Sequence, residues 1–232
     1  MRFADAFVRA GRTTGFAAGL IVSLSLQAVG EDTLLARPPE GAKVLFDGPN
    51  LAAWTKLDGK TPAPWSVEDG AFTVKPRSGD IRTKDSFKSF KLHLEFNVPY
   101  MPNARGQARG NSGVYLQGRY ELQVLDSYGL KLQDNDCGAI YKQIIPSVNA
   151  CKPPLQWQTY DVTFHSAVVE DGKTVKKARL TVVQNGQTII DDKEIVPTPG
   201  GVDLKEGEAG PLLLQDHGNE VKYRNIWIVP IE

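Results

Sequence analysis

The chain has 232 residues, with 27 Lys and Arg against 27 Asp and Glu, and it is 41% hydrophobic and 23% charged. This length suits one large β-sandwich domain or two small domains, and the composition is that of a folded protein, which excludes a disordered chain. The balanced charge removes the electrostatic basis for binding nucleic acid or an anionic membrane, so neither is an expected partner.

The first thirty residues have the pattern of a secretory signal peptide. A basic start precedes a mostly apolar run over residues 15–26, and Ala28 and Gly30 give the small-x-small pattern of a cleavage site. The alternative is a retained membrane anchor, but about twelve apolar residues rise only about 18 Å as a helix, too short for a hydrocarbon core of about 30 Å. We therefore expect a periplasmic or secreted protein, free of the membrane after cleavage, with a lead-in over residues 31–42.

Export also gives a role to the two cysteines of the chain, Cys137 and Cys151. An oxidising compartment favours a disulfide between them, and closing a loop of about 15 residues stabilises by roughly 3 kcal/mol on the chain-entropy model. Two unrelated buried thiols are the alternative. The three histidines lie far apart in sequence, and Asp134–Asp136 is interpreted as a turn rather than a calcium site. No metal or cofactor is expected, although a requirement for a divalent cation stays open.

Period-two alternation of apolar residues predicts one all-β domain over residues 43–232. Over Phe90–Asn97, for example, apolar side chains take one face and polar side chains the other, and Asp69-Gly70 and Asn185-Gly186 are two-residue hairpin signals. About eleven short strands at regular spacing indicate a sandwich or jelly roll. The other strand candidates are 65–68, 71–74, 113–117, 120–125, 159–165, 178–184, 187–190, 212–215 and 221–229.

Uncommon polar groups cluster on strands that should be neighbours. Glu121 and Gln123 share one parity on a strand that follows Asn111 after a turn, so these residues are expected on one hairpin. A solvated strand face explains any one of these groups, whereas their coincidence favours a functional site. Further candidates lie on segments expected nearby in the fold: Asp126, Tyr141, Gln215, His217 and Arg224.

Seven segments, taken in order, resemble the 3-keto-disaccharide hydrolase domain family. They are LFDG (45–48), WSVEDG (65–70), NSGVYLQG (111–118), YELQVLD (120–126), GAIY (138–141), LLLQDHG (212–218) and VKYRNIWI (221–228). The resemblance covers roughly residues 43–229 and implies a concanavalin A-like jelly-roll β-sandwich. Two positions depart from the family, which often has Arg where this chain has Asn97 and Gln117, and both changes bear on substrate preference.

The resemblance implies a substrate that is a glycoside already oxidised at C3 of the sugar. Ordinary retaining hydrolysis needs two carboxylates about 5–5.5 Å apart, and the strand that carries Glu121 has Leu125 four residues further on, so that pair is not evident. A 3-keto sugar needs only a base for the C2 proton, a donor for the enolate oxygen and an acid for the leaving group. Glu121 or His217 is the candidate base, and Tyr141 or His217 the candidate acid.

The remaining candidates bind or orient the sugar: Gln123 and Asn111 as donors, Asp126 as an orienting group, and Gln215 and Arg224 as further binding residues. The hypothesis is an exported enzyme that cleaves 3-keto-glycosides by elimination and hydration. The alternative is a non-catalytic carbohydrate-binding module in which Trp54, Trp65 and Trp157 stack on sugars. The sequence does not define the aglycone, the anomer or the oligomeric state.

Overall fold

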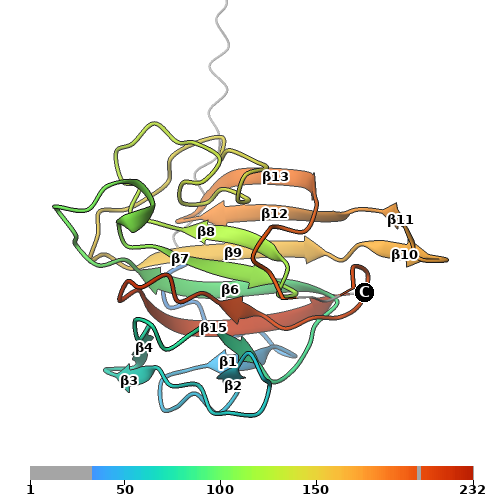
Figure 1. Cartoon of the computed structure of the whole chain (residues 1–232), viewed down its shortest axis with the longest axis horizontal. Coiled ribbons are helices and arrows are strands. Elements are labelled where there is room, and N and C mark those ends of the chain that lie inside the picture. The colour runs from blue at the N-terminus through green and yellow to red at the C-terminus, as the bar shows by residue number, and fades with distance from the viewer. Residues whose placement is uncertain (1–32, 203–204, 232) are drawn as a thin grey trace, which may run out of the picture.

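The computed structural model describes residues 33–202 and 205–231, and these residues form a sandwich of two antiparallel sheets (Figure 1). The predicted all-β sandwich is confirmed. Apart from the short 3₁₀ helix η1 (Gly106–Ala108), the described residues contain no helix, so none is long and apolar enough to cross a membrane. The predicted signal peptide lies outside the described residues.

The larger sheet has eight strands. Their order is β13 (Gln187–Ile195), β12 (Ala178–Gln184), β9 (Gln158–His165), β6 (Ser89–Asn97), β15 (Lys222–Ile231), β4 (Ala71–Thr73) and β3 (Ser66–Glu68), with β1 (Lys43–Phe46) beside β15.

The smaller sheet has five strands in the order β2 (Trp54–Lys56), β5 (Ile81–Thr83), β14 (Leu213–Leu214), β7 (Ser112–Leu116) and β8 (Tyr120–Val124). A separate hairpin of β10 (Val168–Glu170) and β11 (Lys173–Lys176) projects beyond the sandwich at the right of Figure 1.

Alternation places the core between the two sheets. On β8, Tyr120, Leu122 and Val124 are fully buried in the hydrophobic core, so Glu121 and Gln123 must point to the outer face of the five-stranded sheet. A sandwich strand is expected to wet its outer face, yet every residue of β7 and β8 is buried. Loops therefore cover this outer face, which we call the site face.

Trp54 and Trp65 belong to the core, with exposed fractions of 1% and 4%. The Trp54 indole donates to the Leu45 carbonyl at 2.9 Å, and Phe72 packs against both indoles with ring centroids 5.9 and 6.0 Å away. These two tryptophans therefore cannot be the sugar-stacking platforms that the binding-module alternative requires.

The thiols of Cys137 and Cys151 are free in this structure, so the predicted disulfide is not formed. Both residues are buried in the core, and the Gln184 amide nitrogen lies 3.6 Å from one sulfur and 3.5 Å from the other. The two thiols therefore share one polar neighbour, and the cysteines are not unrelated. The segment between them pairs with β8 through an isolated bridge from Leu122 to Ile140.

Candidate active site

Glu121 is the centre of the polar cluster on the site face. Its backbone is held on both sides, because its N–H donates to Thr198 Oγ1 at 3.1 Å and its carbonyl accepts from the Tyr141 N–H at 3.1 Å. The loops that carry Thr198 and Tyr141 leave Glu121 only 4% exposed. Tyr141 is thus brought beside Glu121, as predicted, and its side chain is half-buried.

The Glu121 carboxyl has an unusual protonation equilibrium. Its pKa is raised to about 7, chiefly by burial; a hydrogen bond with Tyr115 opposes this shift, and the negative charge of Asp80 adds to it. Burial, and next the Glu121 charge, raise the pKa of the Tyr115 phenol, so Tyr115 stays a hydrogen-bond donor. A carboxyl that is half ionised near neutral pH is suited to proton transfer in either direction.

Gly113 makes room for this carboxylate. The register pairs Gly113 with Gln123 and Tyr115 with Glu121 across β7 and β8. A Cβ placed on Gly113 would lie 2.6 Å from Glu121 Oε1 and 3.1 Å from Tyr115 Cε2. The Glu121 carboxylate therefore leans over the backbone of β7, where a side chain would exclude it.

The amide side chains predicted to bind substrate lie next to this carboxylate. In one amide orientation Gln123 donates to Gln107 Oε1 at 2.9 Å and to Asn111 Oδ1 at 3.3 Å. In the reversed orientation its nitrogen donates to Glu121 Oε1 at 3.1 Å. Asn111 Nδ2 also donates to the Gln107 carbonyl at 2.7 Å. Gln123 and Asn111 are thus brought together with Glu121, and Gln107 is an addition that sequence reasoning missed.

Gln215 and His217 reach the same face from the end of β14. The Gln215 N–H donates to the Gly113 carbonyl at 3.0 Å, and its amide nitrogen lies 3.3 Å from the Tyr115 hydroxyl. His217 is exposed on the following loop, and its charge lowers the pKa of Asp80. His217 therefore borders the cluster near Asp80 rather than next to Glu121.

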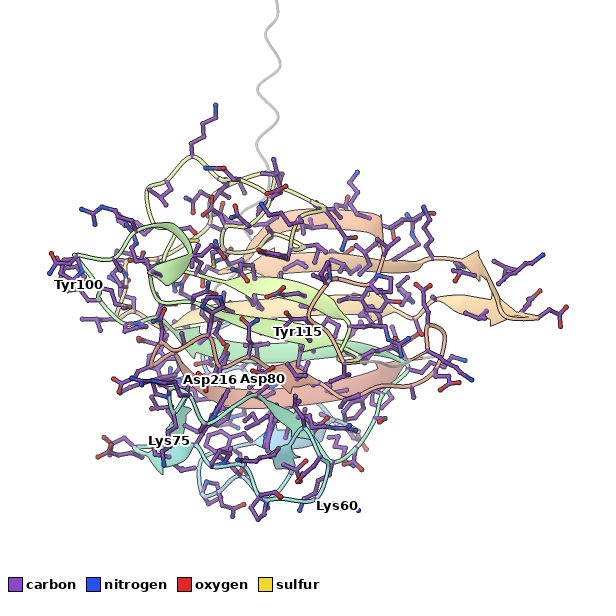
Figure 2. All side chains as sticks on the ribbon, in the orientation of Figure 1. Lys60, Lys75, Asp80, Tyr100, Tyr115 and Asp216 are labelled. Atoms are coloured by element: carbon purple, nitrogen blue, oxygen red, sulfur yellow. The ribbon has the colours of Figure 1, made fainter. Side chains whose placement is uncertain are left out.

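Asp80 and Tyr115 are the functional residues that sequence reasoning missed. Figure 2 labels both near the centre of the view, with Asp216 close to Asp80. Asp80 Oδ1 accepts from the Asp216 N–H at 2.8 Å. Tyr115 shares the parity of Gly113 on a strand already identified, so its position was available from the sequence, whereas nothing around Asp80 marked it.

Asp126 holds a covering loop through one oxygen of its carboxylate. Its Oδ2 lies 2.9 Å from Arg109 Nε, and its N–H donates to the Arg109 carbonyl at 3.1 Å. Arg109 ends the loop that carries Gln107 and leads into Asn111. Asp126 therefore anchors this loop through Arg109, and its role toward substrate stays a prediction.

Arg224 is not part of this cluster, which corrects the sequence-based assignment. It lies on β15 of the eight-stranded sheet, where its Nε pairs with Glu95 Oε2 at 2.6 Å and its guanidinium sits 4.1 Å from the centre of the Trp157 ring. The parity of β6 places Glu95 on the outer face of that sheet. The core therefore separates Arg224 and Trp157 from Glu121.

Within residues 33–202 and 205–231, no group of three or more His, Cys, Asp or Glu side chains is arranged to hold a metal ion. The polar cluster instead contains two carboxyl groups, those of Glu121 and Asp80, together with amide and phenol donors.

Comparison with known proteins identifies a family for this chain. The sequence profile of the 3-keto-alpha-glucoside-1,2-lyase-like domain matches residues 41–229. A Bacteroides thetaiotaomicron protein named 3-keto-disaccharide hydrolase is 25% identical over 254 aligned positions, which cover 88% of this chain and 83% of that protein.

Solved structures that resemble this one include candidate glycosyl hydrolases. A candidate glycosyl hydrolase from Parabacteroides distasonis is 40% identical, with a TM-score of 0.76 over 83% of this chain and 85% of that one. A second one from that organism, 21% identical, has a TM-score of 0.58 over 83% and 95% of the two chains, and it supports the fold alone. The chain therefore belongs to the 3-keto-alpha-glucoside-1,2-lyase-like domain family, a family of glycoside-cleaving enzymes.

Proposed function

We propose that this protein cleaves 3-keto-glycosides, most simply 3-keto-disaccharides, by elimination followed by hydration. The observation that carries the proposal is the buried Glu121 carboxyl, whose pKa of about 7 suits proton transfer, set among amide and phenol donors on the site face. The family match and the relative named for the same substrate class support it.

The reaction follows from the chemistry of the ketone. A carbonyl at C3 acidifies the C2 hydrogen, so a base removes that proton and an enolate forms. The C1–O bond then breaks, the aglycone leaves with a proton from an acid, and an enone remains. Water adds its oxygen to C1 while a proton returns to C2, so the net result is hydrolysis. Amide donors such as Gln123 and Asn111 would stabilise the charge that develops on the enolate oxygen.

The binding-module alternative is less well supported. Trp54 and Trp65 are buried in the core, and Trp157 is covered on one side by the Arg224 guanidinium. A lectin also has no need of a buried carboxyl that titrates near pH 7. A binding module would retain unmodified sugars and leave them intact, whereas the proposed enzyme turns over only the oxidised form.

The test uses 3-keto-trehalose in D₂O with the purified mature protein. Elimination predicts deuterium at C2 of the released sugar, after correction for spontaneous exchange of the ketone, because the C2 proton leaves and a solvent proton replaces it. Glu121→Gln is expected to lower kcat by about 10²–10⁴-fold with little change in binding. Product that carries only its original C2 proton would exclude the elimination mechanism, and unaltered 3-keto-trehalose would exclude the proposed function.

Export and cofactor use are part of the same proposal. A signal peptide ahead of the fold would deliver the enzyme to the periplasm or the medium, where Cys137 and Cys151 can form their disulfide. We expect no cofactor, and the same assay with a chelator checks for a divalent cation. The assay works on the chain in whatever oligomeric state it adopts.

A further inference from the structure

Asp80 lies in one row with Gln215 and Gln123, two amides predicted to bind substrate, and this row runs across neighbouring strands. Asp80 is nevertheless distant from both in sequence. Leu214 pairs with Ile81 and with Val114, so the next pairs along the strands bring Gln215 beside Asp80 on one side and beside Gly113 on the other. Gly113 in turn pairs with Gln123. Because alternate residues share a face, Asp80 points to the site face.

The spacing of this row suits a sugar. Two strand separations of about 4.8 Å each place the backbones of Asp80 and Gly113 roughly 10 Å apart. The Glu121 carboxylate leans over Gly113, since its Oε1 lies 2.6 Å from the position of a Cβ there. The carboxylates of Asp80 and Glu121 therefore lie on the same face on either side of the half-buried Gln215, roughly 6–10 Å apart, a separation comparable with the width of a pyranose ring.

Asp80 is held in place but keeps one oxygen for a ligand. Its Oδ1 accepts from the Asp216 N–H at 2.8 Å, and Asp216 Oδ2 in return accepts from the N–H groups of Ser78 and Gly79 at 2.8 and 2.9 Å. These reciprocal bonds fix the backbone directly before Asp80 and connect it to the backbone of Asp216. Its Oδ2 makes no hydrogen bond within the described part of the chain, and the residue is only half-buried.

We propose that Asp80 is the second catalytic carboxylate, which takes the C2 proton while Glu121 protonates the departing C1 oxygen. This assignment rests on the proposed function and replaces the sequence-based choice of Glu121 or His217 as the base.

The different surroundings of the two carboxyls support this division. Glu121 is 4% exposed beneath covering loops, and burial raises its pKa to about 7, so it holds its proton in mildly acidic solution. The pKa of Asp80 is also raised, chiefly by burial and to a smaller extent by the Asp216 charge, while the hydrogen bond from the Asp216 N–H and the charge of His217 oppose the shift. Asp80 is only half-buried, so it is the more solvated of the two carboxyls. When two carboxyls differ in this way, the more buried one acts as acid and the more solvated one as base.

The protons balance over both half-reactions. In the elimination, the Asp80 carboxylate gains the C2 proton, the C1–O bond breaks, and Glu121 gives its proton to the leaving oxygen. After the aglycone leaves, the Asp80 carboxyl exchanges its proton with solvent. In the hydration, the Glu121 carboxylate takes a proton from water as the water oxygen bonds to C1, and Asp80 delivers its exchanged proton to C2. Both side chains end in their starting states, and no further reactant is needed.

The test compares Asp80→Asn and Glu121→Gln on two substrates, 3-keto-trehalose and 4-nitrophenyl 3-keto-glucoside. Nitrophenolate leaves without a proton, so only the substrate with the poorer leaving group needs the acid. We expect Glu121→Gln to lose about 10²–10⁴-fold in the rate of 3-keto-trehalose cleavage but to stay within about tenfold of the unaltered protein in the single-turnover release of nitrophenolate, which precedes the hydration step. Asp80→Asn should lose about 10²–10⁴-fold on both and should stop deuterium uptake at C2.

The control is Asp85→Asn, which alters an exposed carboxylate beyond the end of β5 that pairs with Lys43. It should leave both rates unchanged.

In Asp80→Asn, the asparagine keeps the Oδ1 acceptor for the Asp216 N–H. Thermal unfolding verifies that this variant folds. Should it unfold, Asp80→Ala supplemented with formate replaces it, and formate is expected to restore turnover.

The outcomes separate the two proposals. Full activity of Asp80→Asn, in a protein that cleaves 3-keto-trehalose, would overturn the role of Asp80 and leave the proposed function intact. If the nitrophenyl leaving group restored the rate of Asp80→Asn but not that of Glu121→Gln, the two roles would be reversed. That result would overturn the assignment. No turnover of either substrate by the unaltered protein would overturn the proposed function, and this assignment with it.

Discussion

At Gly113, one added side-chain carbon would prevent the site from forming as it does in this structure. Its φ is not in the left-handed region, so alanine suits the backbone there, but the added Cβ would lie 2.6 Å from Glu121 Oε1. The flexible end of Glu121 would have to move away from β7. We expect Gly113→Ala to lower kcat/KM by at least about tenfold, because carboxylates must be held within a fraction of an ångström to transfer protons.

The measurement for Gly113→Ala is steady-state kinetics on 3-keto-trehalose alongside thermal unfolding. Because the side chain that yields is flexible, unfolding should change by no more than about 1 kcal/mol. Unchanged kinetics would mean that Glu121 reacts from a position other than the one over Gly113.

Glu121 should also make stability depend on pH. In the folded protein, burial raises its pKa to about 7 from an ordinary value of 4.5. Between these values the folded state holds a proton that the unfolded state has lost, so stability falls as pH rises. Glu121→Gln removes this cost and should raise the free energy of unfolding by up to about 3 kcal/mol at pH 8, with no gain at pH 4. Denaturant unfolding at both pH values measures it, and an equal gain at both would contradict a titrating carboxyl.

At the scale of elements, a buried ion pair connects the loop that carries Gln107 to the end of β8. Asp126 is buried and pairs with Arg109, and Gln107 of that loop bonds Gln123 and Asn111. Asp126→Asn should weaken the attachment by about 1–3 kcal/mol. Because the loop positions amide donors that are proposed both to bind the sugar and to stabilise the enolate, we expect KM to rise and kcat to fall.

Kinetics and limited proteolysis of the loop check this prediction. The exposed pair of Lys43 and Asp85 is the matched control, since its side chains are 47% and 49% exposed and such pairs contribute about 1 kcal/mol or less. Asp126→Asn with unchanged KM and unchanged proteolysis would show that the loop is held by other contacts.

The cysteine loop is the second covering element. The segment after Cys137 runs beside β8, because the Gly138 N–H donates to the Gln123 carbonyl at 3.0 Å and the Gln123 N–H donates to Ala139. Protein purified from the periplasm without reductant should show the mass of a disulfide, two hydrogens below the reduced form. It should lose roughly 3 kcal/mol of stability on reduction. Two thiols that alkylate freely under native conditions would contradict the predicted pairing.

The sequence could predict elements that are long and alternate cleanly. Each end of the four long strands β6, β9, β12 and β15 lies within two residues of its predicted position. Both predicted hairpin turns have positive φ at their central residues, such as Asn185 at 49°. Five strands of three or four residues, β1, β2, β5, β10 and β11, were missed because alternation is hard to detect over so short a run. β3 and β4 are as short but were predicted, since the Asp69-Gly70 turn marks their hairpin. β13 was predicted to end at residue 190 but extends to Ile195. The prediction ended it early because its second half is mostly polar and exposed.

The candidate site was predictable where residues share one hairpin and not where distant segments meet. Glu121, Gln123 and Asn111 lie within one hairpin, so parity alone brings them together. Asp80 joins them only through the pairing of β5 with β14, which no local pattern shows. Arg224 was misplaced for the same reason, since its strand was recognised but its sheet was not.

Over the whole molecule, two polar clusters occupy opposite faces of one core. On the outer face of the eight-stranded sheet, His93 Nδ1 lies 2.7 Å from Asp161 Oδ1, and hydrogen bonds from His93, Asn225 and Arg224 outweigh burial and lower the pKa of Glu95 to about 2. Both His93 and Glu95 are fully buried. Buried charges of this kind are tolerated only when every partner is in place.

The segment of residues 33–36 completes that second cluster. Thr33 Oγ1 donates to Asp161, the Leu35 N–H donates to Glu95, and the Ala36 carbonyl accepts from Asn225 Nδ2 at 3.0 Å. None of these contacts reaches the five-stranded sheet. This segment therefore stabilises the sandwich from the side opposite Glu121.

A chain that begins at Arg37 should separate stability from catalysis. Removing residues 33–36 takes hydrogen bonds from the Glu95 and Asp161 carboxylates, and bonds to charged groups contribute about 1.5–3 kcal/mol each. We expect the free energy of unfolding to fall by about 2–4 kcal/mol, while kcat/KM on 3-keto-trehalose stays unchanged at temperatures well below the unfolding transition. Denaturant unfolding and steady-state kinetics of the two chains measure both quantities. A parallel loss of activity in a fully folded chain would show that the two faces communicate through the core, because Thr33, Leu35 and Ala36 form their hydrogen bonds to Asp161, Glu95 and Asn225 on the opposite face.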